Sequence, residues 1–190
     1  GYRERFVTRH DFSAPFEYDN ITIVPFASFQ VQREFGSTST DSTDWVRTVG
    51  VRASTQFQRV YNDVHNELLD LHRLRHVVEP YVTMWSSDSN VNPANTQQYD
   101  AFFDNIAIGS AMVFGVRNRL QTWRGGPGRW YQVDWLTLDA AVLTASNGAT
   151  QRYDNPQYYD WRPELSSIED AAFLTGKLQL SDGIAFIGNG

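Results

Sequence analysis

The segment Ser110–Thr122 alternates between two kinds of side chain with a period of two residues. Its apolar positions are Met112, Phe114, Val116 and Leu120. Between them stand Gly115, Arg117, Arg119 and Gln121. Because successive residues of a strand point to opposite faces, the segment is predicted to be a strand with one apolar and one cationic face. A buried core would exclude the arginines, and a face in water would not need the apolar row, so the pattern indicates an apolar medium on one side and water on the other.

The same alternation recurs along the chain. It is clear in Val49–Gln58, Trp135–Val142 and Phe173–Leu180. It is weaker in Thr22–Arg33, where Pro25 removes a donor from the hydrogen-bond ladder and predicts a bulge or a strand end. Pro80 poses the same difficulty in the predicted strand that begins near Leu74, where we expect a bulge or a kink.

Composition excludes several classes of protein. The 190 residues suffice for one domain, and the net charge of −6 argues against a nucleic-acid partner. The absence of cysteine excludes disulfides and cysteine metal sites. The longest apolar runs fall far short of the roughly 18 residues of a membrane helix. A membrane strand remains compatible, since its signal is only alternation over about 9–11 residues.

Long and short connections alternate between the predicted strands. The long polar ones are Gly36–Asp44, Ser86–Asn105 and Ser146–Asp170, and the short ones include 124–129 and 181–183. We predict an all-β fold, an antiparallel up-and-down meander of about eight strands. The alternation of long and short connections is typical of transmembrane outer-membrane β-barrels, which have short turns on one side of the membrane and longer loops on the other. We expect residues 1–190 to be one region of a larger barrel domain, truncated at both ends. An amphipathic helix over Asn62–Arg75 is an alternative to a turn there.

Two segments carry a resemblance to a known family. They are Leu74-Arg75-His76-Val77-Val78-Glu79-Pro80-Tyr81-Val82 and Phe114-Gly115-Val116-Arg117-Asn118-Arg119-Leu120-Gln121-Thr122. With the strand that follows at 133–139, they resemble the C-terminal β-barrel of the LptD family of lipopolysaccharide-assembly proteins of the outer membrane. The preceding strands, around 23–26 and 50–53, are similar in order. Residue-level likeness is confined to 74–139.

The resemblance implies a role in inserting lipopolysaccharide into the outer leaflet of the cell outer membrane. It implies lipopolysaccharide or a related glycolipid, outer-membrane lipid, a plug lipoprotein and periplasmic bridge components as partners. It implies neither an enzyme nor a cofactor. A generic porin or receptor barrel, and a secreted carbohydrate-binding β-sandwich, are the alternatives.

The polar rows supply candidates for the lumen of such a barrel. They are Arg52, Gln56, Glu79, Arg117, Arg119 and Asp139. Arginine binds phosphate through two parallel hydrogen bonds, so the arginines are candidates for contact with a phosphate-bearing glycolipid. The favoured interpretation is that they pair with Glu79 or Asp139.

The apolar rows supply candidates for contact with lipid. They are Val49, Val51, Phe57, Met112, Phe114, Val116, Leu120, Leu136, Leu138 and Val142. Trp123, Trp130, Tyr131 and Trp135 flank the glycine-rich turn and are candidates for an aromatic girdle at the lipid interface. Tyr81 and Trp85 are candidates for the opposite rim.

Two further groups have weaker chemical interpretations. Glu79, Asp134 and Asp139 include no pair with the spacing of a glycosidase, and lumen carboxylates explain them equally well. His65, His72 and His76 have a helical spacing, but no carboxylate pattern supports a metal site, so polar surface histidines are favoured. We therefore predict no catalytic, metal or cofactor residues.

Overall fold

The computed structural model describes residues 3–36, 42–90, 104–126, 128–155 and 157–190. The strands are β1 (Arg3–Ser13), β2 (Phe16–Tyr18), β3 (Ile21–Gly36), β4 (Ser42–Thr55), β5 (Phe57–Asn66), β6 (Leu71–Ser89), β7 (Gly109–Arg124), β8 (Tyr131–Ala145), β9 (Ala171–Ser181) and β10 (Ile184–Asn189). A 3₁₀ turn, η2 (Pro163–Leu165), lies in the connection between β8 and β9. The prediction of an all-β fold is confirmed.

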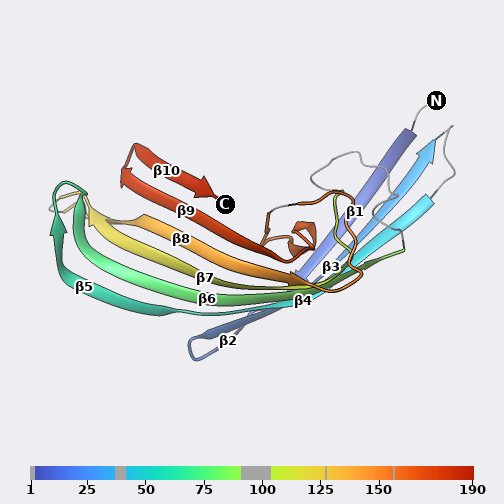
Figure 1. Ribbon diagram of the computed structural model, residues 1–190, viewed down its shortest axis with the longest axis horizontal. Helices are drawn as coiled ribbons and strands as arrows, with labels where there is room; N and C mark the ends of the chain where they lie inside the picture. Colours follow the sequence, from blue (N-terminus) through green and yellow to red (C-terminus); the bar gives the residue numbers. More distant parts are fainter. Residues whose placement is uncertain (1–2, 37–41, 91–103, 127, 156) are drawn as a thin grey trace.

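The strands form one antiparallel sheet in up-and-down order, β1-β3-β4-β6-β7-β8-β9-β10. β2 pairs with β3 as β1 does, and β5 pairs with β6 as β4 does. β1 with β2, and β4 with β5, each cross the sheet once, so the ten strands make eight crossings of the sheet. This agrees with the prediction of about eight strands. The sheet is open, because within the described residues β1 and β10 each pair on one side only (Figure 1).

Both interruptions lie at or next to a residue that faces a proline of the neighbouring strand, and the first also contains a proline, Pro15. Between β1 and β2 the gap falls at residues 14–15, opposite Pro25 and Val24 of β3. Between β4 and β5 the gap falls at Gln56. Ser54 pairs with Tyr81 and Phe57 with Val78, so Thr55 lies opposite Pro80 and Gln56 lies opposite Glu79. Proline has no N–H to give to the ladder. β3 and β6 run through Pro25 and Pro80 with no register shift there, so the predicted bulge or strand end at these residues is wrong. The interruptions lie in the neighbouring strands instead.

Short and long connections lie at opposite ends of the sheet, as the alternation predicted. The tight ones are Asp19–Asn20, 67–70, 125–130 and 182–183. The longer connections, between β3 and β4, β6 and β7, and β8 and β9, start and end at the other end of the sheet; residues 37–41, 91–103 and 156 within them lie outside the described residues. The helix alternative over Asn62–Arg75 is wrong: β5 and β6 run through it and join in a tight turn. Asp70 takes a positive φ of 48° in this turn.

The curved sheet has two chemically different faces. The connection 146–170 lies on its concave side, and we call that side the inner face (Figure 1). The opposite, convex side is the outer face. It carries many exposed apolar side chains, among them Ile23, Phe29, Val49, Met84, Phe114, Val116, Val142 and Leu174. The folded chain therefore exposes apolar rows rather than enclosing them.

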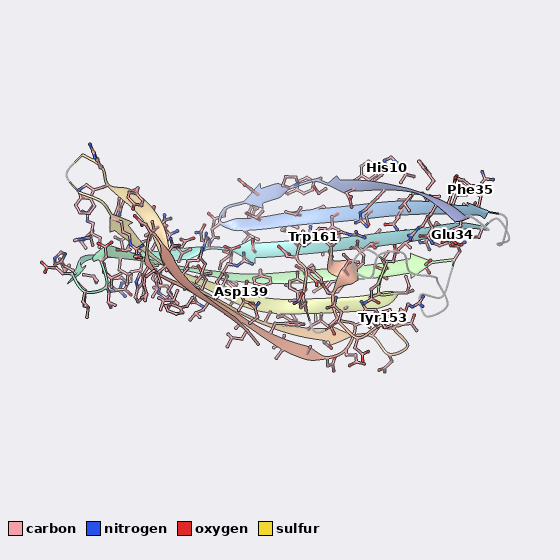
Figure 2. The ribbon with its side chains drawn as sticks, turned by 90° about the horizontal axis from the view of Figure 1, so that it is seen from above. His10, Glu34, Phe35, Asp139, Tyr153 and Trp161 are labelled. Atoms are coloured by element: carbon pink, nitrogen blue, oxygen red, sulfur yellow. The ribbon has the colours of Figure 1, made fainter. Side chains whose placement is uncertain are left out.

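The compact core lies on the inner face, at the end with the long connections. It consists of Trp85, Ala111, Val113, Ala141 and Leu143, against which Tyr158 and Phe173 pack. Figure 2 shows Trp161 and η2 lying over the middle strands. At this end the inner face is thus apolar and covered over β6 to β8, which the alternation alone did not predict, whereas over β3 it carries buried polar side chains such as Gln30 and Gln32.

Ion pairs tie the long connections to the edge strand β1. Arg9 of β1 contacts Glu164 of η2 at 2.7 Å, and Arg162 contacts the same carboxylate at 2.9 Å. Arg5 of β1 contacts Asp104 at 2.6 Å. Glu164 is only 1% exposed. These contacts span almost the whole sheet, from the β8–β9 connection to β1.

Arg124 organises the short-turn end. Its guanidinium is buried and donates to the backbone carbonyls of Gln179 and Leu180, at 2.7 and 2.8 Å. It also forms ion pairs with Asp70 and Asp182, at 3.2 and 3.4 Å. The pairing of β8 with β9 ends at Leu178, so Arg124 satisfies carbonyls that lie beyond the ladder.

Candidate functional site

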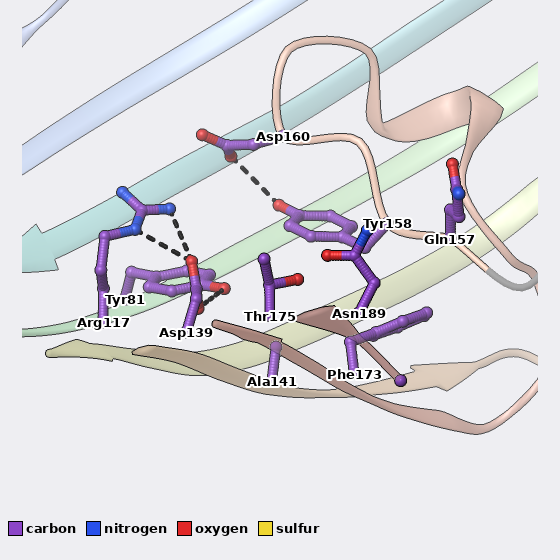
Figure 3. Close-up of a pocket in the computed structure, with 11 residues that line it drawn as sticks. Tyr81, Arg117, Asp139, Ala141, Gln157, Tyr158, Asp160, Phe173, Thr175 and Asn189 are labelled. Atoms are coloured by element: carbon purple, nitrogen blue, oxygen red, sulfur yellow. Dashed lines mark hydrogen bonds and ion pairs between the residues drawn. The ribbon is translucent and has the colours of Figure 1, made fainter. Parts of the chain in front are cut away.

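A hollow of about 490 Å³ opens on the inner face beside the core (Figure 3). Strands β6 to β9 provide its floor, the connection 157–160 covers one side, and the end of β10 provides another. The lining side chains are Tyr81, Arg117, Asp139, Ala141, Gln157, Tyr158, Asp160, Phe173, Thr175 and Asn189. Its volume is in the range of small-molecule sites.

The charged side chains of its floor neutralise one another. Arg117 donates from Nε to Asp139 at 2.9 Å, and its guanidinium lies 3.9 Å from Glu79. Arg119 contacts Glu79 at 3.2 Å. The Tyr81 hydroxyl donates to Asp139 at 3.0 Å. The interpretation that the arginines pair with Glu79 and Asp139 is therefore confirmed for Arg117 and Arg119.

This network joins the two segments that carry the family resemblance. β6 and β7 are neighbours, and Glu79 lies directly opposite Arg117 in the ladder. On the outer face of the same pair, His76 Nε2 lies 3.3 Å from Asn118 Oδ1. Charged and polar residues 40 positions apart in the sequence thus form one cross-strand ladder.

Tyr81 occupies this place because Gly115 stands opposite it. A Cβ atom at Gly115 would lie 2.2 Å from Cζ of Tyr81 and 2.4 Å from its hydroxyl oxygen. The ring therefore lies flat across the glycine and reaches Asp139 on β8. Gly50 and Phe26 repeat this arrangement, with 2.4 Å between a Cβ at Gly50 and the Phe26 ring. Aromatic side chains that cover strand glycines stabilise such sheets.

Replacing Gly115 by alanine should destabilise the protein by about 1–3 kcal/mol, because the Tyr81 ring must leave its place and its hydrogen bond to Asp139. In a Tyr81→Ala background the same replacement should be nearly neutral. Unfolding in urea of the four proteins of this double-mutant cycle measures the coupling. Equal effects of the glycine replacement in both backgrounds would contradict the role assigned to Tyr81.

The connection 157–160 supplies the cover of the hollow. The Tyr158 hydroxyl donates to Asp160 at 3.1 Å, and its ring packs between Trp85 and Phe173. Burial raises the pKa of Tyr158 well above its ordinary value, so the phenol stays neutral. Arg52 donates to the Asp160 carbonyl at 2.7 Å and lies over the Phe26 ring. Arg52 therefore pairs with the connection and not with Glu79 or Asp139.

Five of the six lumen candidates lie on the inner face by register, and Gln56 has no partner in the ladder. Arg117, Asp139, Glu79 and Arg119 form the network above, Arg52 lies apart from them beside Asp160, and Gln56 is exposed between β4 and β5. The ten lipid candidates share the outer face: Phe114, for example, stands between Val82 and Val142, and Val116 between Pro80 and Ala140.

The aromatic candidates are dispersed. Alternation along β7 places Trp123 on the side opposite Phe114, where it lines a second hollow with Trp130. The Tyr131 hydroxyl forms a short hydrogen bond with Asp182. Trp135 occupies the bulge that shifts the register of β8 against β7. The prediction of Tyr81 and Trp85 as a rim is wrong, because Tyr81 lies in the inner network and Trp85 is buried in the core.

The remaining polar candidates are held by separate partners. Asp134 accepts a hydrogen bond from Gln121 at 2.7 Å, away from the contacts of Glu79 and Asp139. His65 and His72 are opposite each other across the β5–β6 hairpin, whereas His76 lies further along β6. Among the described residues, no group of three or more histidine, aspartate or glutamate side chains is arranged to hold a metal ion.

Sequence reasoning missed Tyr158, Asp160 and Glu164, which come from the long connection. No alternation marks a connection, and their partners lie across the sheet. The density of aromatic and acidic residues in 153–164 was the available signal.

Comparisons with family models, with curated proteins and with solved structures find no match for this chain. In the described part of the chain there is no helix long and apolar enough to span a membrane.

Proposed function

We propose that this chain forms part of the wall of an outer-membrane β-barrel that takes part in assembling lipopolysaccharide at the cell surface. The observation that carries the proposal is the exposed apolar outer face on an open up-and-down sheet whose inner face bears the charges. Lipid would cover that face, and further strands would close the sheet, because open edges are not tolerated in the hydrocarbon region.

The dimensions of the apolar rows support this proposal. Val49–Phe57 on β4 and β5 and Met112–Leu120 on β7 each extend over nine residues, with Thr55 and Asn118 as polar positions within them, and this is the length with which tilted strands cross a bilayer core. Polar pairs bound the rows at both ends. Arg47 and Asp88 form an exposed ion pair near the long connections, and Arg59 stands opposite His76 towards the short turns.

A secreted β-sandwich would cover the same rows with a second sheet. Among the described elements, those in contact are neighbours within the single sheet, apart from η2, which contacts β6. The exposed outer face therefore favours the barrel wall over the sandwich.

The lipopolysaccharide part of the proposal rests on the resemblance of residues 74–82 and 114–122 to the assembly family. The Glu79–Arg117 and Glu79–Arg119 contacts join these two segments, which gives their residues a shared structural role. The implied lipoprotein and periplasmic partners rest on the resemblance alone.

Fractionation of cells that produce the full-length protein tests this function. We expect the protein in the outer-membrane fraction, extracted only by detergent, and we expect its depletion to lower lipopolysaccharide at the cell surface. Recovery in the detergent-free soluble fraction would refute the barrel wall. Membrane recovery with unchanged surface lipopolysaccharide would refute the assembly role and leave a porin or receptor barrel.

A further inference from the structure

The tip of the β5–β6 hairpin brings two of the four histidines of the chain together. His65 and His72 are direct partners in the antiparallel ladder, and their ring centroids lie 4.6 Å apart with the planes tilted by 52°. The rings are therefore not stacked. They line a hollow of about 450 Å³ with Asn62, Val64, Arg73, Trp123 and Trp130.

This separation fits two imidazoles that share one metal ion. A metal–nitrogen bond is about 2.0–2.1 Å long, and the ring centre lies about 1.1 Å behind the nitrogen. Two imidazoles at tetrahedral or right angles around one ion then have centroids about 4.5–5.2 Å apart. The observed 4.6 Å lies within that range.

We propose that His65 and His72 form a two-histidine site for a divalent transition-metal ion such as Cu²⁺, Ni²⁺ or Zn²⁺. Imidazole suits these ions. Because the described residues hold no group of three histidine, cysteine, aspartate or glutamate side chains there, solvent or an external molecule completes the coordination. This site is separate from the barrel-wall function and does not depend on it.

The charged neighbours of the site are mixed. Asp70 Oδ1 lies 3.5 Å from His72 Nε2, and Glu67 Oε1 lies 3.9 Å from His65 Nε2. These carboxylates favour a cation, but Arg73 lines the hollow and Arg124 pairs with Asp70. The attraction of the two carboxylates for a metal ion is therefore nearly balanced by the repulsion of the two arginines. The preference among metal ions then follows from the imidazole ligands. We expect Cu²⁺ to bind more tightly than Ni²⁺ or Zn²⁺, and Mn²⁺ to bind most weakly.

Trp130 provides a built-in reporter. Its ring lies edge-on to His72, with centroids 5.2 Å apart. A paramagnetic Cu²⁺ ion at the histidine pair should quench its fluorescence and that of Trp123, which lines the same hollow, so a variant with both Trp123→Phe and Trp130→Phe should lose most of that quenching while still binding the ion.

Calorimetric titration of the full-length protein in detergent with CuCl₂, NiCl₂ and ZnCl₂ tests the site. We expect one equivalent of Cu²⁺ to bind, and His65→Asn or His72→Asn to weaken binding by at least about tenfold, since each removes one of two protein ligands. His10→Asn and His76→Asn are matched controls, because they replace the other two histidines, and they should leave the affinity unchanged.

Electron paramagnetic resonance of the copper-loaded wild-type protein supplies a readout independent of variant folding. Hyperfine splitting from two nitrogen ligands is the expected result. The proposal is overturned by the absence of saturable binding, by a single nitrogen ligand, or by a site that His76→Asn or His10→Asn removes.

Discussion

Replacing Phe114 by arginine should prevent most of the protein from assembling in a membrane. Phe114 lies in the middle of the outer apolar row of β7 and is 52% exposed. An arginine on the lipid face near the bilayer midplane costs about 2–4 kcal/mol. In water, the same change at an exposed position would cost little. The expected loss is measured as the fraction of protein that becomes protease-resistant on insertion into lipid vesicles.

Tyr153→Arg is the matched control. Tyr153 is an aromatic residue with 53% exposure, but it lies in the connection between β8 and β9. We expect its replacement to leave vesicle assembly almost unchanged. Equal assembly of the Phe114→Arg and Tyr153→Arg proteins would show that the outer row does not meet lipid.

Replacing Glu164 by glutamine should destabilise the folded protein by about 3 kcal/mol, because it removes the buried carboxylate that both Arg162 and Arg9 contact, while Arg9 keeps its contact with Asp11. Glu164 is 1% exposed and joins Arg162 of its own connection to Arg9 of β1. The result is measured as a shift in the urea midpoint of unfolding. Hydrogen exchange should also increase in β1, since the tie across the inner face is lost.

Asp11→Asn provides the comparison on the same cation. Asp11 contacts Arg9 at 2.6 Å, but its side chain is 63% exposed. Solvent-exposed ion pairs contribute about 0–1 kcal/mol, so this variant should unfold close to the wild-type midpoint. A larger effect of Asp11→Asn than of Glu164→Gln would contradict the role of the buried tie.

The strands and their faces were predictable because alternation is a local property of the sequence. Phe114 and Arg117 belong to opposite rows whichever strands lie beside β7. Pro25 and Pro80 predicted defects in their own strands, but these strands run on, and the break near Pro80 lies in the partner strand. Finding it requires the register of Ser54 against Tyr81, which is not a local property.

The core and the cover of the hollow could not be predicted for a related reason. Val113 and Leu143 belong to rows that are polar further along, and they are buried among strand side chains and Tyr158 of the connection that folds back over them. Contacts such as Arg9 with Glu164 join residues at a separation that no local pattern encodes. For His65 and His72 a local pattern was misleading. Their spacing of seven residues suggested one face of a helix, but in the structure they are cross-strand partners in the β5–β6 hairpin.

The central claim is that the outer face of the sheet contacts lipid and the inner face contacts water. Because the chain has no cysteine, single cysteines at successive positions from Met112 to Leu120 can be spin-labelled without background. In lipid vesicles, the account predicts that labels at 112, 114, 116 and 120 are relaxed by oxygen, which partitions into lipid, and that labels at 117 and 119 are relaxed by a water-soluble nickel complex. Nickel accessibility at 114 and 116 equal to that at 117 and 119 would contradict it.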